Sequence, residues 1–324
     1  MIVTLTLNPS LDRTLEVERL RRGGVNRAET VRIDPGGKGV NVTRALRAFG
    51  IESRAVIPFG GPDGQELVRM LAAADVPIAQ VPVGGWTRSN VTVVEPGGAS
   101  TKINAPGDPL TDEELAALAE TMLRACDSDG SSAEASWVVL CGSLPPGVPD
   151  GVYATLTSLF TSRGIRVAVD TSGPALAATV AAGPDLIKPN REELAAAVGA
   201  PLASIGDVVA AAGRLRERGA KAVLASLGSD GAVLVDDSGA VLCTADPVEP
   251  RSTVGAGDAL LAGFLAAGAQ GHDAVIDAVA WGRAAVGLPG SRMPGPGDVS
   301  RDGIRVVRDP GGAPEYAALS SHEG

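Results

Sequence analysis

The sequence is poor in aromatic residues and in histidine, and both shortages restrict what the protein can do. Phe, Trp and Tyr make up only 3% of the 324 residues, so a core must be built from Ala, Val and Leu. The only histidines are His272 and His322, and the second lies in a polar tail. A catalytic triad built on histidine, or a metal site with several histidines, is therefore not expected.

Cysteine, positive charge and long apolar runs are also scarce. The three cysteines, Cys126, Cys141 and Cys243, are odd in number and lack metal-site spacing, which favours buried thiols in a reducing compartment. The formal net charge of −10 offers no basic surface to nucleic acid or to an anionic membrane. No apolar run is long enough to span a bilayer, and the N-terminal IVTLTL is too short for a signal peptide. These shortages predict a soluble, cytoplasmic protein without a nucleic-acid or membrane partner.

What the sequence does contain is an alternation of short β-rich runs with longer helical patterns. This alternation predicts a doubly wound α/β fold, in which helices cover both faces of a mostly parallel sheet. The expected strands are residues 2–7, 53–60, 137–142, 166–171, 185–190 and 222–228. The expected helices are residues 39–50, 64–74, 114–125 and 207–219. In such a sheet, ligands bind beyond the carboxyl ends of the strands.

Some segments interrupt this rhythm. Residues 12–34 and 87–104 have strand character without a helical period, and we expect them to form a small β-sheet that projects as a lid or a dimer surface. The polar residues 128–134 are expected to form a loop, and the Pro/Gly-rich tail from 289 is expected to be loosely ordered. No internal repeat is present, so residues 1–324 are expected to form a single domain with this lid.

The most informative segment is STVGAGDALLAGFL, residues 252–265, in which Asp258 follows two glycines and precedes an apolar run. A helix start attracts negative charge because its first backbone N–H groups lack partners. One interpretation is that Asp258 only caps this helix. The other is that its carboxylate faces a bound ligand. The segment alone does not decide between them.

Two earlier segments place cations beside glycines or at a strand start. DPGGKGVN puts Lys38 and Asn41 where a glycine-rich loop enters a helix, either as an anion site or as a tight turn with a solvated lysine. This is not a Walker A loop, because Gly39 rather than Ser or Thr follows the lysine. WTRSN sets Arg88 and Asn90 two residues apart on a strand, so that both side chains face one way. An arginine fork suits a phosphate, and a solvated strand arginine is the alternative.

Three further segments follow predicted strands. GSLPPG contains Ser143, which with nearby N–H groups would hold a phosphate or only form a turn. KPNREE sets Asn190 and Glu193 three residues apart, as in a helix capping box, whereas the functional alternative puts Glu193 near a hydrated Mg²⁺. SLGSDG, residues 226–231, is either a β-turn or a loop against a nucleotide. Singly these segments are ambiguous, and their order along the chain is what is informative.

The order GGKGVN, TRSN, GSLPPG, KPNREE, SLGSDG and TVGAGD resembles that of the ribokinase-like (PfkB) carbohydrate kinases. The resemblance runs from LTLNPSLD at the N-terminus to LPGSRMP, and GGKGVN and TVGAGD match the two signature regions of that family. It implies a ribokinase-like, Rossmann-like domain whose small β-sheet lid often pairs subunits, so a homodimer through the lid is expected. It also implies ATP and Mg²⁺ as cofactors and a phosphorylated ketohexose as substrate.

The resemblance also implies roles for individual residues. Asp258 would be the general base that takes the proton from the sugar hydroxyl, and Gly255, Ala256 and Gly257 would form an anion hole for the moving phosphoryl group. Phosphoryl transfer demands such positioning and charge neutralisation. Glu193 would lie near Mg²⁺ and bind it through water. The sugar phosphate would be bound by Asp12, Gly37, Lys38, Asn41, Arg88, Asn90 and Ser143. The nucleotide would be bound by Lys188, Asn190, Ser226, Gly228, Gly231 and Thr253.

Within the family, the segments LNPSLDRT, GGKGVN and WTRSN are most similar to those of the 1-phosphofructokinases. Lys38 fits enzymes that act on fructose 1-phosphate or tagatose 6-phosphate, because related 6-phosphofructokinases can carry glycine there. The expected reaction converts fructose 1-phosphate and ATP into fructose 1,6-bisphosphate and ADP. Tagatose-6-phosphate kinase and 6-phosphofructokinase activities are alternatives, and a non-catalytic sugar- or nucleotide-binding protein is a remote one.

Overall fold

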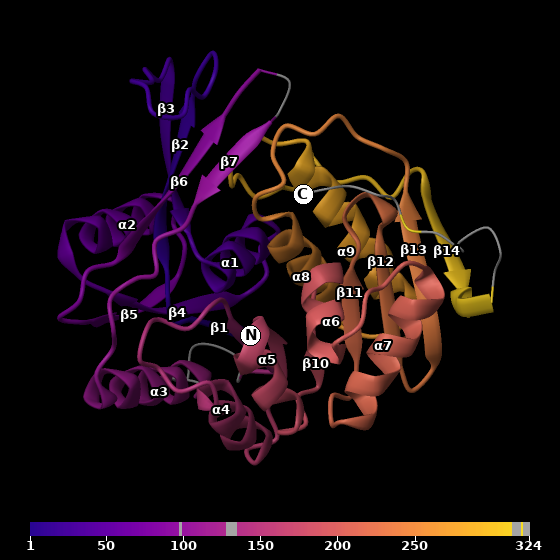
Figure 1. The fold of residues 1–324 in the computed structure, drawn as a ribbon. Helices are drawn as coiled ribbons and strands as arrows, with labels where there is room; N and C mark the ends of the chain where they lie inside the picture. The colour runs from indigo at the N-terminus through magenta and orange to yellow at the C-terminus, as the bar shows by residue number, and fades with distance from the viewer. Residues whose placement is uncertain (97–98, 128–134, 313–318, 320–324) are drawn as a thin grey trace.

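A ten-stranded sheet runs through the centre of the molecule in the order β14-β13-β12-β11-β10-β9-β8-β1-β4-β5 (Figure 1). The computed structural model describes residues 1–96, 99–127, 135–312 and 319, so the predicted loop at 128–134 lies outside the described residues. The strands of the large sheet are β1 (Ile2–Thr6), β4 (Ser53–Phe59), β5 (Ile78–Pro82), β8 (Trp137–Cys141), β9 (Arg166–Asp170), β10 (Leu186–Ile187), β11 (Val223–Ser226), β12 (Ala232–Asp236), β13 (Gly239–Ala245) and β14 (Ile304–Arg308).

The sheet is parallel from β5 to β11 and antiparallel from β11 to β14. This confirms the predicted doubly wound, mostly parallel arrangement. The prediction of a loosely ordered tail from 289 was wrong for residues 304–308, which form β14. This strand pairs with β13 from Val241↔Arg308 to Ala245↔Ile304, so its partner lies about sixty residues away in sequence and no local pattern announces it.

Helices cover both faces of the large sheet, and the strands divide their side chains between the two cores. On β8, Val138 and Leu140 enter the core that α3 to α7 share, whereas Val139 and Cys141 enter the core of α1, α8 and α9. Within the described ranges, no helix is both long and apolar enough to cross a bilayer. The helices are α1 (Lys38–Ala48), α2 (Gly61–Ala73), α3 (Asp112–Cys126), α4 (Val152–Thr161), α5 (Gly173–Val180), α6 (Arg191–Val198), α7 (Ile205–Glu217), α8 (Ala256–Ala266) and α9 (Gly271–Val286).

A second, four-stranded sheet forms the small β-sheet expected from the sequence. Its order is β3 (Thr30–Gly36), β2 (Ser10–Glu16), β6 (Arg88–Val94) and β7 (Ser100–Ile103). Figure 1 shows this lid sheet projecting from the main body beside α1 and α2. The chain therefore inserts two pieces of the lid between elements of the large sheet, as the interruptions in the sequence indicated.

The direction in which the chain adds strands changes between β1 and β8. From β1 the sheet grows outward through β4 and β5, whereas from β8 it grows the other way through β9, β10 and β11. Side chains and loops diverge at the carboxyl ends of two such neighbouring strands, which opens a crevice suited to ligands. The fold therefore predicts a ligand-binding crevice at the segments that follow β1 and β8.

Candidate active site

Polar side chains collect at the carboxyl ends of the central strands. Asn8 follows β1, Ser143 follows β8, Asp170 ends β9 and Lys188 follows β10. The Nδ2 of Asn8 donates a hydrogen bond to Oγ of Ser143 at 3.5 Å, directly across the point where the strand order changes. The same edge therefore carries groups that are widely separated in sequence.

The start of α8 lies at this site and carries no side-chain cap. Gly255 precedes the helix with φ of 79°, and a Cβ at this position would come within 2.5 Å of Cε of Met293, so only glycine fits without a shift. The N–H groups of the first turn, which begins at Ala256 and Gly257, are not bound by a capping side chain. An uncapped helix N-terminus favours an anion.

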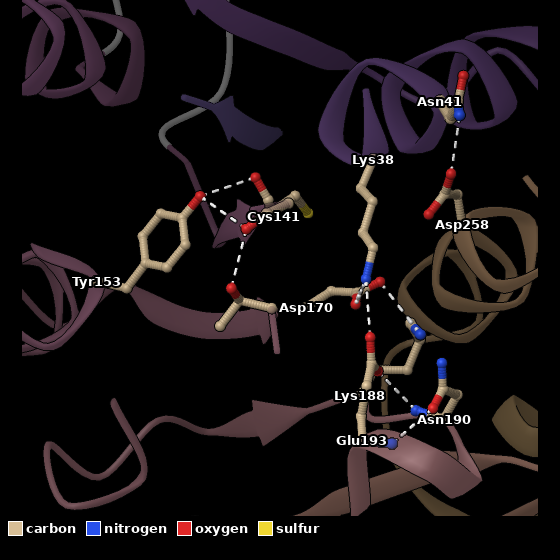
Figure 2. Close-up of polar contacts among 11 residues, drawn as sticks. Lys38, Asn41, Cys141, Tyr153, Asp170, Lys188, Asn190, Glu193 and Asp258 are labelled. Atoms are coloured by element: carbon tan, nitrogen blue, oxygen red, sulfur yellow. Dashed lines mark hydrogen bonds and ion pairs between the residues drawn. The ribbon is translucent and has the colours of Figure 1, made fainter. Parts of the chain in front are cut away.

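Asp258 turns away from its own helix toward α1. Its Oδ2 accepts a hydrogen bond of 2.8 Å from Nδ2 of Asn41, as Figure 2 shows. The residue is only 8% exposed, and its carboxylate does not cap α8. The interpretation of Asp258 as a simple helix cap is therefore wrong, and the carboxylate joins the first glycine-rich segment to the last.

The environment of Asp258 holds its pKa at about 6, above the ordinary value for aspartate. Burial is the largest cause, and the negative charge of Asp170 adds to it, whereas Lys38, the hydrogen bond from Asn41 and Lys188 oppose the rise. A carboxylate with this pKa is largely ionised at neutral pH and still basic enough to accept a proton. This combination suits a general base.

Two lysines share the buried carboxylate of Asp170. Nζ of Lys38 lies 2.7 Å from Oδ1 of Asp170, and Nζ of Lys188 lies 3.2 Å from Oδ2 without the alignment of a hydrogen bond. Lys38 also lies 3.5 Å from Oε1 of Glu193 (Figure 2). Asp170 was not singled out from the sequence, where an acidic residue ending the apolar strand RVAVD was the one available signal.

The pKa of Lys38 and the pKa of Asp170 both shift toward the charged form. Burial alone would lower the pKa of Lys38, but Asp170 and Glu193 outweigh it and raise the pKa above its usual value. Burial alone would raise the pKa of Asp170, but Lys188 and Lys38 outweigh it and keep the pKa low. The ion pairs that Lys38 and Lys188 form with Asp170 therefore tie α1 to the ends of β9 and β10.

Asn190 and Glu193 form the capping box that the sequence allowed. Asn190 Oδ1 accepts from the N–H of Glu193, and Glu193 Oε2 accepts from the N–H of Asn190, both at 2.8 Å. The remaining oxygen, Oε1, faces Lys38. Among the described residues, no group of three acidic, histidine or cysteine side chains is arranged to hold a metal. Glu193 would reach a hydrated Mg²⁺ through water, as the resemblance implied.

The expected sugar side of the site lies along β2 and β6. Oδ1 of Asp12 accepts hydrogen bonds from Oγ of Ser10 at 2.7 Å and from Nδ2 of Asn90 at 3.0 Å. Arg88 and Asn90 both contact the backbone of Ala105, so their side chains face one way as their spacing predicted. Nε of Arg88 is buried without a hydrogen-bond partner. Burial lowers the pKa of this guanidinium, and the negative charge of Asp12 only partly opposes this effect.

Gly37 lets the first glycine-rich loop pass close to β1. Its φ is 116°, and a Cβ here would lie 2.8 Å from Cγ2 of Thr6. The helix α1 starts at the next residue, Lys38, with no side-chain cap. Asn41 then follows on the next turn of α1. Two uncapped helix starts, those of α1 and α8, thus belong to one site.

The expected nucleotide-binding residues lie on neighbouring loops. Asn190 forms a parallel bridge with Ser226 at the end of β11. Gly228 begins the short 3-10 helix η1 (Gly228–Asp230), and Gly231 follows it. Thr253 is exposed and lies just before α8. Among the described residues, no direct hydrogen bond or ion pair links Arg88 or Asp12 to the cluster around Lys38.

Comparison with known proteins gives one consistent result. The profile of the pfkB family carbohydrate kinases matches residues 5–296. The chain is 38% identical to the ATP-dependent 6-phosphofructokinase isozyme 2 of Escherichia coli, with 90% of this chain and 94% of that protein covered. It is also 38% identical to the 1-phosphofructokinase of Rhodobacter capsulatus, with coverage of 91% and 93%. The structure of Escherichia coli phosphofructokinase-2 in complex with substrates and products matches with a TM-score of 0.84, 38% identity and coverage of 92% and 96%.

The fold, the two uncapped helix starts and these matches define the class of the protein. The chain belongs to the pfkB family of carbohydrate kinases. It is therefore an enzyme that phosphorylates a sugar phosphate, as the order of its motifs predicted.

Proposed function

We propose that the protein transfers the γ-phosphoryl group of ATP to the 6-hydroxyl of fructose 1-phosphate. The observation that carries this proposal is the placement of Asp258, a buried carboxylate at the uncapped start of α8 within the network that contains Lys38. A base and an anion site at one helix start are what phosphoryl transfer to a hydroxyl needs.

Asp258 takes the proton as the sugar oxygen attacks. Asn41 occupies Oδ2, and Oδ1 accepts no hydrogen bond from the described residues, so Oδ1 is the oxygen that serves as acceptor for the sugar proton. The pKa of about 6 keeps Asp258 ionised before the proton moves. General-base assistance of this kind is worth roughly 10²–10⁴-fold in rate.

The start of α8 and Lys188 neutralise the moving phosphoryl group. The N–H groups of Gly255, Ala256 and Gly257 would provide donors at a positive helix end, where that of Ala256 also contacts the carbonyl of Thr253 at 3.4 Å. The ammonium of Lys188 lies 3.5 Å from the position that a Cβ on Gly257 would take. Lys38 stands in the same network through Asp170. Mg²⁺, held through water near Glu193, would supply further charge neutralisation to the phosphates of ATP.

The sugar lies between Asp258 and the lid strands in this proposal. Asp12 and Asn90 bind hydroxyl groups, Gly37 and Asn41 line the base of the site, and Ser143 faces it from the end of β8. Arg88 carries a guanidinium with an unpaired, buried N–H, which favours a phosphate ester as its partner. Nucleotide contacts are assigned to Asn190, Ser226, Gly228, Gly231 and Thr253.

The choice of sugar rests on Lys38. The two relatives, a 6-phosphofructokinase and a 1-phosphofructokinase, are equally identical to the chain and do not decide it. Lysine at this position favours fructose 1-phosphate or tagatose 6-phosphate, and the LNPSLDRT and WTRSN segments favour the former. Fructose 6-phosphate and tagatose 6-phosphate are the competing acceptors.

A panel assay tests this assignment. ATP is supplied with fructose 1-phosphate, fructose 6-phosphate, tagatose 6-phosphate and unphosphorylated fructose, and ADP release is measured with identification of the product. We expect the highest kcat/KM with fructose 1-phosphate. A higher kcat/KM with either 6-phosphate overturns the choice of sugar, and no ADP release with any of them overturns the kinase assignment.

We further propose that two copies pair through their lid sheets. The lid contains exposed apolar side chains that a single chain leaves uncovered, namely Val25 (77%), Val31 (58%) and Ile103 (61%). Val31 and Ile103 lie on the two edge strands of the lid sheet, β3 and β7, and Val25 lies in the loop between β2 and β3. Exposed apolar residues on one small element favour a protein partner.

A further inference from the structure

The amide of Asn41 stands between the proposed base and a guanidinium. Its Nδ2 donates to Asp258, while its Oδ1 accepts a hydrogen bond of 3.0 Å from Nη1 of Arg44, one turn further along α1. Arginine carries only donors, so the oxygen of the amide must face Arg44. The nitrogen is then left to face Asp258. The two hydrogen-bond partners therefore determine which end of the Asn41 amide faces Asp258.

Arg44 is itself held in place from two other directions. The same Nη1 also lies 3.1 Å from the carbonyl oxygen of Pro35 at the end of β3 and 3.1 Å from that of Ser291 in the loop after α9, so its two hydrogens are shared among these carbonyls and the amide of Asn41. These acceptors come from the lid strand and from the C-terminal part of the chain. The guanidinium therefore has little freedom to move, which makes it a firm support for the amide.

We propose that Arg44 is a positioning residue for the base: by binding the amide oxygen of Asn41, it keeps the amide nitrogen on Asp258 and leaves the second carboxylate oxygen to the sugar hydroxyl. This inference rests on the proposed role of Asp258. In this proposal Arg44 acts on the base through its neighbour Asn41.

The proposal has a consequence for the pH dependence of turnover. An amide that presents its N–H to Asp258 favours the carboxylate form, and the positive charge of Arg44 also interacts favourably with Asp258. The other charged groups that act on Asp258 are Asp170, Lys38 and Lys188. Removal of Arg44 leaves those three in place and frees the amide to rotate. The protonated form of Asp258 is then favoured over the carboxylate. The acidic limb of the pH profile of kcat therefore moves to higher pH.

The first experiment compares two arginine variants of the same helix. Arg44→Met removes the proposed support, whereas Arg47→Met removes an exposed arginine that contacts Asp75 outside the site. For Arg44→Met we expect the acidic limb of kcat to move to higher pH and kcat at neutral pH to fall by about tenfold, the effect of losing one hydrogen bond to a charged group. Both KM values should change little, and Arg47→Met should behave like wild type. An unmoved limb in Arg44→Met overturns the proposal.

A double-mutant cycle tests whether Arg44 acts through Asn41. In an Asn41→Ala background, Arg44→Met should produce no further shift of the limb, because the amide it supports is absent. An additive shift overturns the proposal. Arg44→Lys keeps a donor-only cation and should restore the limb toward its wild-type position, whereas a fully displaced limb counts against the proposal.

Two controls separate this inference from others. If Arg44→Met does not fold, Arg44→Gln is used in its place. A glutamine amide offers both a donor and an acceptor, so it does not fix the orientation of Asn41. The acidic limb of kcat must then also move to higher pH in Arg44→Gln. Asp258→Asn separates the two proposals. If Asp258→Asn keeps its turnover, the base assignment itself fails, whereas an inactive Asp258→Asn with an unmoved limb in Arg44→Met overturns only the role of Arg44.

Discussion

Lys38 and Asp170 lie 132 residues apart in the sequence and form an ion pair of 2.7 Å at the centre of the site. The carboxylate of Asp170 is fully buried and also neighbours Lys188, which is 4% exposed. A buried charge of this kind depends on its partners, because desolvation is compensated only while the opposite charges stay close.

Asp170→Asn should therefore destabilise the protein strongly. It removes the negative charge and leaves the buried ammonium of Lys188 unpaired, which costs about 3–5 kcal/mol. Urea unfolding measures this loss. The matched control is Glu66→Gln, which breaks an exposed pair with Arg69 and should leave the stability nearly unchanged. Equal losses in the two variants would contradict the structural importance of Asp170.

Asp258→Asn should nearly abolish turnover while ATP binding persists. Asparagine keeps the size of the side chain and still accepts the hydrogen bond from Asn41, but it cannot take a proton. We expect kcat to fall by roughly 10²–10⁴-fold. Asp273→Asn, the same substitution at an exposed position on α9, is the control and should leave kcat unchanged. Near-normal turnover in Asp258→Asn would remove the base from the mechanism.

The activity and the stability contributed by Asp258 should respond to pH in opposite directions. Turnover needs the carboxylate, so kcat should decline as pH falls through about 6, the pKa of Asp258. The folded protein binds this proton more tightly than the unfolded chain does. The unfolding free energy contributed by Asp258 therefore rises as pH falls from about 6 toward the ordinary aspartate value. Comparison of the pH dependence of Tm for wild type and Asp258→Asn isolates this contribution, and a kcat that stays level down to pH 5 would argue against the assignment.

Arg88→Ala should weaken binding of the phosphorylated sugar far more than binding of ATP. The guanidinium is the group on the lid strands with an unpaired, buried N–H, so its loss removes a charge-assisted contact to phosphate. Steady-state kinetics should show a KM for sugar phosphate at least tenfold higher, with about 1.4 kcal/mol corresponding to that factor. Unphosphorylated fructose serves as the control acceptor, and its poor turnover should not change further. Equal effects on the two KM values would contradict the phosphate role.

Charged residues on the lid should separate the proposed dimer. The double variant of Val31→Lys and Ile103→Lys places charges on exposed apolar positions of β3 and β7. We expect light scattering to give a dimer for wild type and a monomer for this variant. Val248→Lys, at an exposed position outside the lid, is the control. A wild type that is already monomeric would rule out pairing through the lid.

The sequence predicted the large sheet well because its central strands carry local patterns that repeat. The strand–helix alternation located β1, β4, β8, β9 and β11, and glycine-rich turns located the loops that follow them. It did not locate β5, β12, β13 or β14, and β14 is ordered by its pairing with β13 rather than by its own five residues. Strands formed mainly by distant pairing leave little local trace.

The site was predicted in part for a similar reason. Motif order singled out Asp258 and Lys38, but only coordinates show that the first bonds to Asn41 and the second pairs with Asp170. Asp170 and Arg44 were missed, since a single charged residue in an apolar strand or helix looks like many surface residues. Their importance arises from partners that approach across the fold, which a one-dimensional pattern does not contain.

Helix α1 carries Lys38, Asn41 and Arg44 at intervals of three residues, so that three successive side chains meet three different parts of the site. A small rotation or translation of α1 would therefore displace all three side chains together. The position of α1 is fixed by the core on which it packs, in which Leu46 is fully buried. Shortening this buried leucine, as in Leu46→Ala, should therefore lower kcat as well as the free energy of unfolding.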